Sequence, residues 1–105
     1  MAAARALAHH AATVSCEDLP EAALEATRKF LLDSFGVALA GSAAPWAKEL
    51  ADMQQSWGRG TDARNWAFGT MMPAPAAAFA NAYQLHNSEF DCIHEEAVVH
   101  PMAVT

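Results

Sequence analysis

The residues that could do chemistry are concentrated in one segment, residues 86–100. This stretch of fifteen residues carries three of the five histidines and four carboxylates, namely His86, His94, His100, Glu89, Asp91, Glu95 and Glu96. An isolated buried charge is costly, so these groups either pair with one another, take part in chemistry or face water. The segment is therefore the candidate site, and three interpretations of it compete.

The first interpretation is general acid–base catalysis. Imidazoles and carboxylates can move protons near neutral pH once their surroundings adjust their proton affinities. Removing a proton next to a carboxylate and then expelling hydroxide or carbon dioxide requires a base, an acid and groups that hold the carboxylates. The base and the acid could come from Glu89, Asp91, His94 and His100.

The second interpretation is a metal site, and the third is a solvated acidic loop. Glu96 and His100 are four residues apart and Asp91 and His94 are three apart, spacings that would fit one face of a helix. The segment has no HExxH motif, no zinc-type spacing of cysteine and histidine, and no calcium-loop pattern. The metal interpretation therefore rests on spacing alone and is the weakest of the three. The pattern alone does not separate catalysis from a loop whose histidines only cap and bridge.

The elements that must position this segment are predicted to be helices. Residues 2–12 are rich in alanine, the best helix former. Ser15 and Asp18 resemble a capping box, and Pro20 suits the first turn of a helix, so a helix is expected to start there. In residues 20–40, apolar and small side chains recur at spacings of three and four, which predicts an amphipathic helix. Its apolar face consists of Ala23, Leu24, Thr27, Leu31, Ser34, Phe35, Ala38 and Leu39.

Glycine, proline and tryptophan mark the next elements. Within the long helix, Gly36 is expected to allow close packing, and Gly41 is expected to end the helix. A second helix is predicted over residues 45–57. One stripe of this helix carries Trp46, Leu50, Met53 and Trp57, and its tryptophans are expected to be core anchors.

The remaining elements complete an all-α prediction. Residues 65–68 are expected to be a short extended stretch, residues 76–86 a helix, and residues 100–105 the beginning of another helix. A chain of 105 residues suits one domain, because two separate cores would be hard to fill at this size.

Charge and composition exclude several classes of function. The formal net charge of −6 argues against nucleic-acid binding, which needs phosphate-neutralising lysine and arginine. No apolar run is long enough to span a membrane, and the first ten residues lack the apolar core of a secretory signal, so a cytoplasmic location is expected. Cys16 and Cys92 form no CxxC pair and are expected to be free thiols.

Several stretches of the chain, in order, resemble the MmgE/PrpD family. They are residues 19–21, 29–42, 68–70 and 73–81, followed by Leu85, His86, Phe90, Asp91, His94 and residues 99–101. The match runs in register from about residue 15 to the end. The resemblance implies that residues 1–105 are an incomplete N-terminal part of the family's large helical domain, without its smaller α/β lid domain.

The resemblance also implies roles for the ionisable residues. Members of the family are lyases of carboxylic acids, or related isomerases, usually homodimeric and generally without a metal or organic cofactor. On this basis His100 is expected to transfer the proton, with Glu89, Asp91 and His94 as further catalytic residues. Glu89 replaces the first aspartate of the family's pattern, which keeps the charge but extends the side chain by one methylene.

The resemblance assigns substrate binding to three positions of the same segment. They are His86, Cys92 and Ile93, and two of them depart from the family's pattern. Cys92 stands where the family has an aspartate, and Ile93 stands where it has a threonine. Isoleucine cannot make the hydrogen bond expected of that threonine hydroxyl. The substrate or reaction is therefore expected to differ from that of the family's named members.

The sequence thus predicts the N-terminal portion of a cofactor-independent lyase that acts on a small di- or tricarboxylic acid. The expected partners are that substrate and, in the full-length protein, a second copy in a homodimer. The alternative is a truncated, non-catalytic helical remnant that only binds a partner or ligand.

Overall fold

The computed structural model describes residues 2–58 and 60–103, and most of them are helical. The elements are α1 (Ala2–Thr13), the 3-10 turn η1 (Cys16–Asp18), α2 (Glu21–Gly41), α3 (Ala47–Trp57), β1 (Ala63–Arg64), β2 (Met71–Met72), α4 (Ala74–His86) and the 3-10 turn η2 (Pro101–Ala103). The predicted fold class is confirmed, because the only strands within the described residues form a sheet of two short strands. Each of the four long helices lies within about two residues of its predicted bounds.

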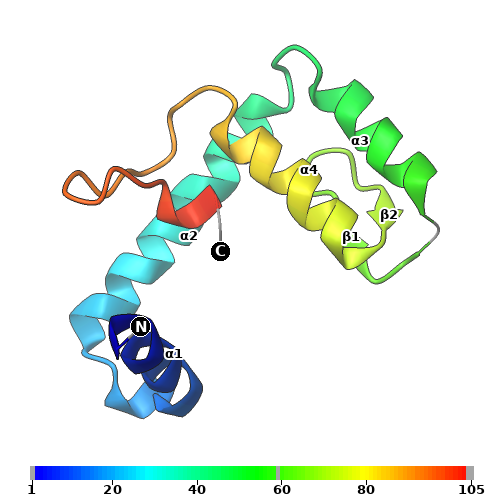
Figure 1. The fold of residues 1–105 in the computed structure, drawn as a ribbon. Coiled ribbons are helices and arrows are strands. Elements are labelled where there is room, and N and C mark those ends of the chain that lie inside the picture. The colour runs from blue at the N-terminus through cyan, green and yellow to red at the C-terminus, as the bar shows by residue number, and fades with distance from the viewer. Residues whose placement is uncertain (1, 59, 104–105) are drawn as a thin grey trace.

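The main contact in the fold is the packing of α4 against α2 near the C-terminal end of α2 (Figure 1). Gly41 makes this contact possible, since a Cβ atom at that position would lie only 1.9 Å from the backbone oxygen of Gln84. The Asn87 side chain also donates a 2.8 Å hydrogen bond to the Gly41 carbonyl oxygen. Gly41 therefore ends α2 as predicted, and it also fixes the distance between the two helices.

A small core lies between α3, the hairpin and α4. It contains Ala51, Met72, Ala77 and Ala80, with Ala63, Phe68 and Ala76 packed against it. The predicted anchoring role of the large α3 residues is wrong within this chain, because Trp46 is 71% exposed and Trp57 is 72% exposed. The buried face of α3 carries Ala47, Ala51 and Gln54 instead. Small side chains on that face allow α3 to approach α4 closely, which leaves the large residues outside.

The two strands pair as an antiparallel hairpin, with Ala63 opposite Met72 and Arg64 opposite Met71. The extended stretch predicted at residues 65–68 is wrong, because these residues form the turn between the strands. The Asn65 side chain accepts a hydrogen bond from the Phe68 N–H and stabilises this turn. The Asn81 side chain of α4 hydrogen-bonds the hairpin backbone twice. Its oxygen accepts a hydrogen bond from the Trp66 N–H at 3.0 Å, and its NH2 group donates one to the Arg64 carbonyl oxygen at 3.1 Å.

The predicted capping box forms, but it does not start the long helix. The Ser15 backbone N–H and hydroxyl both donate to one oxygen of Asp18, at 3.1 and 2.8 Å. The box closes the single turn η1, and Leu19 is extended. The long helix α2 then begins at Glu21, after Pro20. A separate turn therefore precedes the helix that the motif was expected to open.

The predicted apolar face of α2 is mostly exposed. Its buried residues are Ser34, Ala38 and Gly41, whereas Leu31, Phe35 and Leu39 are exposed. The prediction of close packing at Gly36 is wrong within this chain, because a Cβ atom there would meet nothing within 4 Å. The physical reason is the position of α4, which covers only the C-terminal part of α2 (Figure 1).

The two ends of the described chain differ. Helix α1 contains no buried residue. The helix expected from residue 100 is a single 3-10 turn, η2, which packs on both α2 and α4, while residues 104–105 lie outside the described residues. Among the helices of residues 2–58 and 60–103, none is both long and apolar enough to cross a membrane.

Candidate functional site

The candidate site is built where α4 ends and the chain loops back. His86 is the last residue of α4, and Asn87 fastens this end to Gly41. After residues 87–93, a backbone hydrogen bond of 2.9 Å from His94 to Val99 closes a turn. Because η2 then packs on α2 and α4, the chain returns His100 to a position beside His86. The two imidazole rings meet edge to face, with centroids 4.4 Å apart.

Asp91 lies between the two histidines. Its side chain is fully buried, and each carboxylate oxygen faces a different imidazole. Oδ1 lies 3.1 Å from Nδ1 of His86, within hydrogen-bond geometry. Oδ2 lies 3.2 Å from Nδ1 of His100, but these two atoms are not aligned as a hydrogen bond. A single buried carboxylate therefore contacts the same ring nitrogen of both histidines.

Glu89 lies on the other edge of both rings. Its two carboxylate oxygens are 3.4 Å from Nε2 of His86 and 3.7 Å from Nε2 of His100. The backbone of Glu89 is left-handed, with φ of 57°, and its N–H donates to the His86 carbonyl. This conformation, uncommon for residues other than glycine, belongs to the tight turn in which Glu89 faces the histidines.

The arrangement gives the two carboxylates different roles. An ionised carboxylate only accepts hydrogen bonds, so Nδ1 of His86, which has hydrogen-bond geometry to Asp91, is expected to carry a proton. In that neutral tautomer Nε2 of His86 has a free lone pair. Glu89 has a side chain that is 72% exposed, so it can move or exchange protons with solvent. The cluster of His86, Glu89, Asp91 and His100 can therefore store and transfer a proton.

The other predicted site residues lie outside this cluster. His94 is exposed, and its Nδ1 accepts a hydrogen bond from the Ala97 N–H within the turn. Ile93 is exposed and Cys92 is half-buried with a free thiol. The pairs Asp91–His94 and Glu96–His100, considered as metal ligands, presuppose a helix. The structure has a loop and turn over residues 87–100 instead, so helical spacing does not bring these pairs onto one face.

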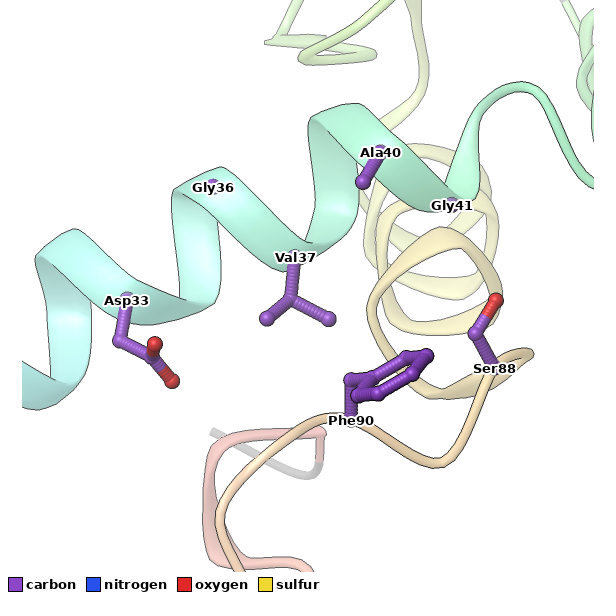
Figure 2. Close-up of a pocket in the computed structure, with 7 residues that line it drawn as sticks. All are labelled: Asp33, Gly36, Val37, Ala40, Gly41, Ser88 and Phe90. Carbon is purple, nitrogen blue, oxygen red and sulfur yellow. The ribbon is translucent and has the colours of Figure 1, made fainter.

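Two cavities adjoin the loop. One, of about 440 Å³, is lined by His86 and Glu89 of the cluster together with Phe79, Ala82, Tyr83, Asn87 and Ala103. The other, of about 470 Å³, lies between α2 and the first part of the loop and is lined by Asp33, Gly36, Val37, Ala40, Gly41, Ser88 and Phe90. Figure 2 shows Ser88 and Phe90 of the loop across from Val37 and Gly41 of α2. The first cavity has His86 and Glu89 of the cluster in its lining and the second has no residue of the cluster, so the first is the better candidate for a substrate.

The structure adds a contact to His86 that its predicted role in substrate binding did not include. His86 lies beside His100, and its Nδ1 is hydrogen-bonded to Asp91 at 3.1 Å. One signal was present: Glu89 follows His86 by three residues at the end of a helix, where a tight turn brings such residues together. The contact with His100 depends on the returning loop, and no local pattern indicates it.

Comparison with curated proteins finds similarity to a decarboxylase. Cis-aconitate decarboxylase from Aspergillus terreus is 26% identical over 98 residues, which cover 93% of this chain and 20% of the decarboxylase. The enzyme from strain NIH 2624 of that fungus gives the same values. The chain therefore spans about a fifth of the length of these curated relatives. No solved structure matches it at a significant level.

The comparison with protein families covers nearly the whole chain. The MmgE/PrpD N-terminal domain matches residues 5–105, which include every helix-forming stretch from α2 onward and the entire cluster of His86, Glu89, Asp91 and His100. The resemblance noted from separate motifs is thereby confirmed, and this chain belongs to the MmgE/PrpD family.

Proposed function

We propose that this chain supplies one wall of a lyase active site for a small di- or tricarboxylic acid, and that His100 transfers the proton. The observation that carries the proposal is the buried carboxylate of Asp91 between Nδ1 of His86 and Nδ1 of His100. A small rotation of the His100 ring would align its Nδ1 with Oδ2 of Asp91, and a carboxylate hydrogen-bonded in this way fixes the tautomer and orientation of an imidazole. The same relation of acid to histidine underlies proton transfer in serine hydrolases.

The proposed step moves one proton between His100 Nε2 and a substrate carbon. In a dehydration, Nε2 takes the proton from the carbon next to a carboxylate. The C–H electron pair forms the new double bond, and the leaving hydroxyl takes a proton from solvent and departs as water. In a decarboxylation, the C–C pair stays on the substrate as carbon dioxide leaves, protonated His100 gives its Nε2 proton to that carbon, and solvent reprotonates the imidazole. Both reactions need the proton carrier that Asp91 and His100 provide.

The substrate class rests on two supports. The named relatives are decarboxylases of cis-aconitate, a tricarboxylic acid, and the similarity covers the cluster. The cavity beside His86 and Glu89, of about 440 Å³, lies within the range of about 300–1,000 Å³ typical of small-molecule sites. Cys92 and Ile93, next to Asp91 in sequence, are proposed to adjust which acid is accepted.

The test is to incubate the full-length protein with citrate-like acids. Turnover is measured as release of carbon dioxide and as ultraviolet absorption of the new double bond. His100→Gln is expected to lower kcat by at least about 100-fold, the lower range for loss of an acid–base group. His10→Gln is the matched control, because His10 is an exposed histidine of α1. Near-normal turnover in His100→Gln would remove His100 from the mechanism.

A non-catalytic binding role is the second candidate. It is favoured by the exposed apolar residues of α2 and α3, which offer surface for another protein segment, among them Leu32, Phe35, Trp46 and Trp57. Absence of turnover on every acid tried, together with tight binding of one of them, would favour this role.

The cytoplasmic location and the homodimer remain predictions, and size-exclusion chromatography with light scattering tests the homodimer.

A further inference from the structure

We propose that His86, Glu89 and His100 also bind a divalent transition-metal ion, zinc best, and that the bound ion blocks proton transfer. The binding part stands on geometry alone. The blocking part rests on the proposed function, because it requires that Nε2 of His100 carries the transferred proton.

The three side chains converge at the spacing that a metal ion needs. One ligand atom from each of His86, Glu89 and His100 lies within 4.8 Å of the other two. The two oxygens of Glu89 each approach one imidazole, with Oε1 3.4 Å from Nε2 of His86 and Oε2 3.7 Å from Nε2 of His100. Zinc bonds of about 2.0–2.2 Å in a tetrahedral site put neighbouring ligand atoms about 3.3–3.6 Å apart. Small side-chain adjustments would therefore close the site around an ion.

Asp91 contacts both histidines on the ring edge away from Glu89. Histidine ligands usually direct their second ring nitrogen at a carboxylate or carbonyl, which sets the tautomer and raises ligand basicity. Here Asp91 hydrogen-bonds Nδ1 of His86 at 3.1 Å, and its other oxygen lies 3.2 Å from Nδ1 of His100 without hydrogen-bond alignment. Asp91 therefore orients His86 directly, and a small rotation of the His100 ring would bring it into the same relation.

The donor set also fits the ion. Two imidazoles and one carboxylate are a known ligand set for zinc, with a fourth position left to water or substrate. Glu89 is largely exposed and His86 is 43% exposed, so an ion can reach the cluster from solvent. These features predict a reversible site of moderate affinity with an open coordination position.

Metal binding and proton transfer compete for the same electrons. The Nε2 lone pair of a neutral imidazole can bind a metal or accept a proton, but it cannot do both. A bound ion would also occupy Glu89, which lines the cavity proposed for the substrate. We therefore expect added zinc to lower turnover and a chelator to restore it, whereas a chelator added to the metal-free protein leaves turnover unchanged.

Calorimetric titration with zinc chloride alone, without substrate, tests the binding part. One zinc ion per chain is expected, and cobalt chloride should give the intense visible absorption of a four-coordinate site. Glu89→Gln is expected to weaken zinc binding by at least about 100-fold, because it removes the anionic ligand. Asp91→Asn is expected to weaken it by about 10–100-fold, the usual effect of a lost second-shell carboxylate. Glu95→Gln is the matched control, an exposed carboxylate of the same loop.

The outcomes separate the two proposals. Unchanged zinc affinity in Glu89→Gln, with helical circular dichroism equal to that of the unaltered protein, overturns the metal site. So does the absence of a stoichiometric zinc site in the unaltered protein. Zinc binding without any loss of turnover overturns the competition. Because binding is measured without substrate, failure of the His100→Gln activity test leaves this result intact.

Discussion

Residues 34–103 and residues 2–33 differ in how their side chains pack. Every buried residue among those described lies at or after Ser34, and most are alanine, glycine or amide side chains. The earlier part has α1 and most of α2 on the surface, with Phe30, Leu31 and Leu32 exposed. Close backbone approach and buried amide hydrogen bonds therefore order the region that carries the site. Both regions expose large apolar side chains, but among the described residues only residues 34–103 also contain buried ones.

The contrast teaches that residue size is a poor guide to burial in this chain. The α2–α4 crossing needs a residue without a side chain at Gly41, and the hairpin is held by Asn81. Both serve to place the end of α4, from which the site loop begins. A small substitution at the α2–α4 crossing should therefore lower the free energy of unfolding far more than the same substitution in α2 a few residues earlier.

The largest effect is expected from Gly41→Ala. The added Cβ would lie 1.9 Å from the Gln84 oxygen, which is backbone and cannot rotate away, so α4 must shift. We expect a loss of at least about 3 kcal/mol in the free energy of unfolding, the upper range for overpacking. Urea denaturation followed by circular dichroism measures it.

Gly36→Ala is the control on the same helix. Its Cβ would meet nothing within 4 Å, and alanine is a better helix former than glycine. A gain of about 0.5–1 kcal/mol is expected. Equal effects of the two substitutions would contradict the distinction between the crossing and the rest of α2.

An intermediate effect is expected from Asn81→Ala. The substitution leaves the Trp66 N–H and the Arg64 carbonyl without their partner. Because both hydrogen bonds are part-buried, water can reach the freed groups, and we expect a total loss of about 1–2 kcal/mol in the free energy of unfolding. The same substitution at Gln55, an exposed residue of α3, should change stability little. A loss at Asn81 no larger than at Gln55 would show that the hairpin does not depend on this amide.

The smallest effect concerns Ser15 and Asp18 in the N-terminal region. Hydrogen bonds from the Ser15 backbone and then from its hydroxyl hold the pKa of the Asp18 carboxyl below its ordinary value. A lowered pKa in the folded chain contributes stability above the unfolded pKa, and this contribution is lost as the pH falls through the folded pKa. Ser15→Ala removes the hydroxyl and should raise the pKa of Asp18 part of the way back, as measured by NMR titration. No change would mean that the capping box does not form in solution.

The sequence predicted the helices better than it predicted their buried faces. Helix bounds follow from local signals such as Pro20, Gly41 and the alanine-rich run of α4, and the structure agrees with them. Burial depends on which elements meet. The stripe of Leu50, Met53 and Trp57 has the right period for a core face, yet α4 packs against Ala47, Ala51 and Gln54. Period alone could not show which face of α3 meets α4.

The sequence indicated which segment carries the candidate site, but only partly how its side chains are arranged. The density of ionisable groups in residues 86–100 singled out Glu89, Asp91 and His100, and the structure brings these three side chains together. It could not show that His94 turns away or that His86 shares Asp91 with His100. Those facts depend on the return of the chain through the turn at residues 95–98 and on the packing of η2.

The central claim is that Asp91 fixes the protonation of both neighbouring imidazoles. Long-range proton–nitrogen NMR correlations report directly which ring nitrogen carries hydrogen, and His10 serves as an internal reference. The account predicts that, once neutral, His86 and His100 both carry hydrogen on Nδ1 and leave Nε2 bare. Hydrogen on Nε2 with a bare Nδ1 in both residues would contradict it.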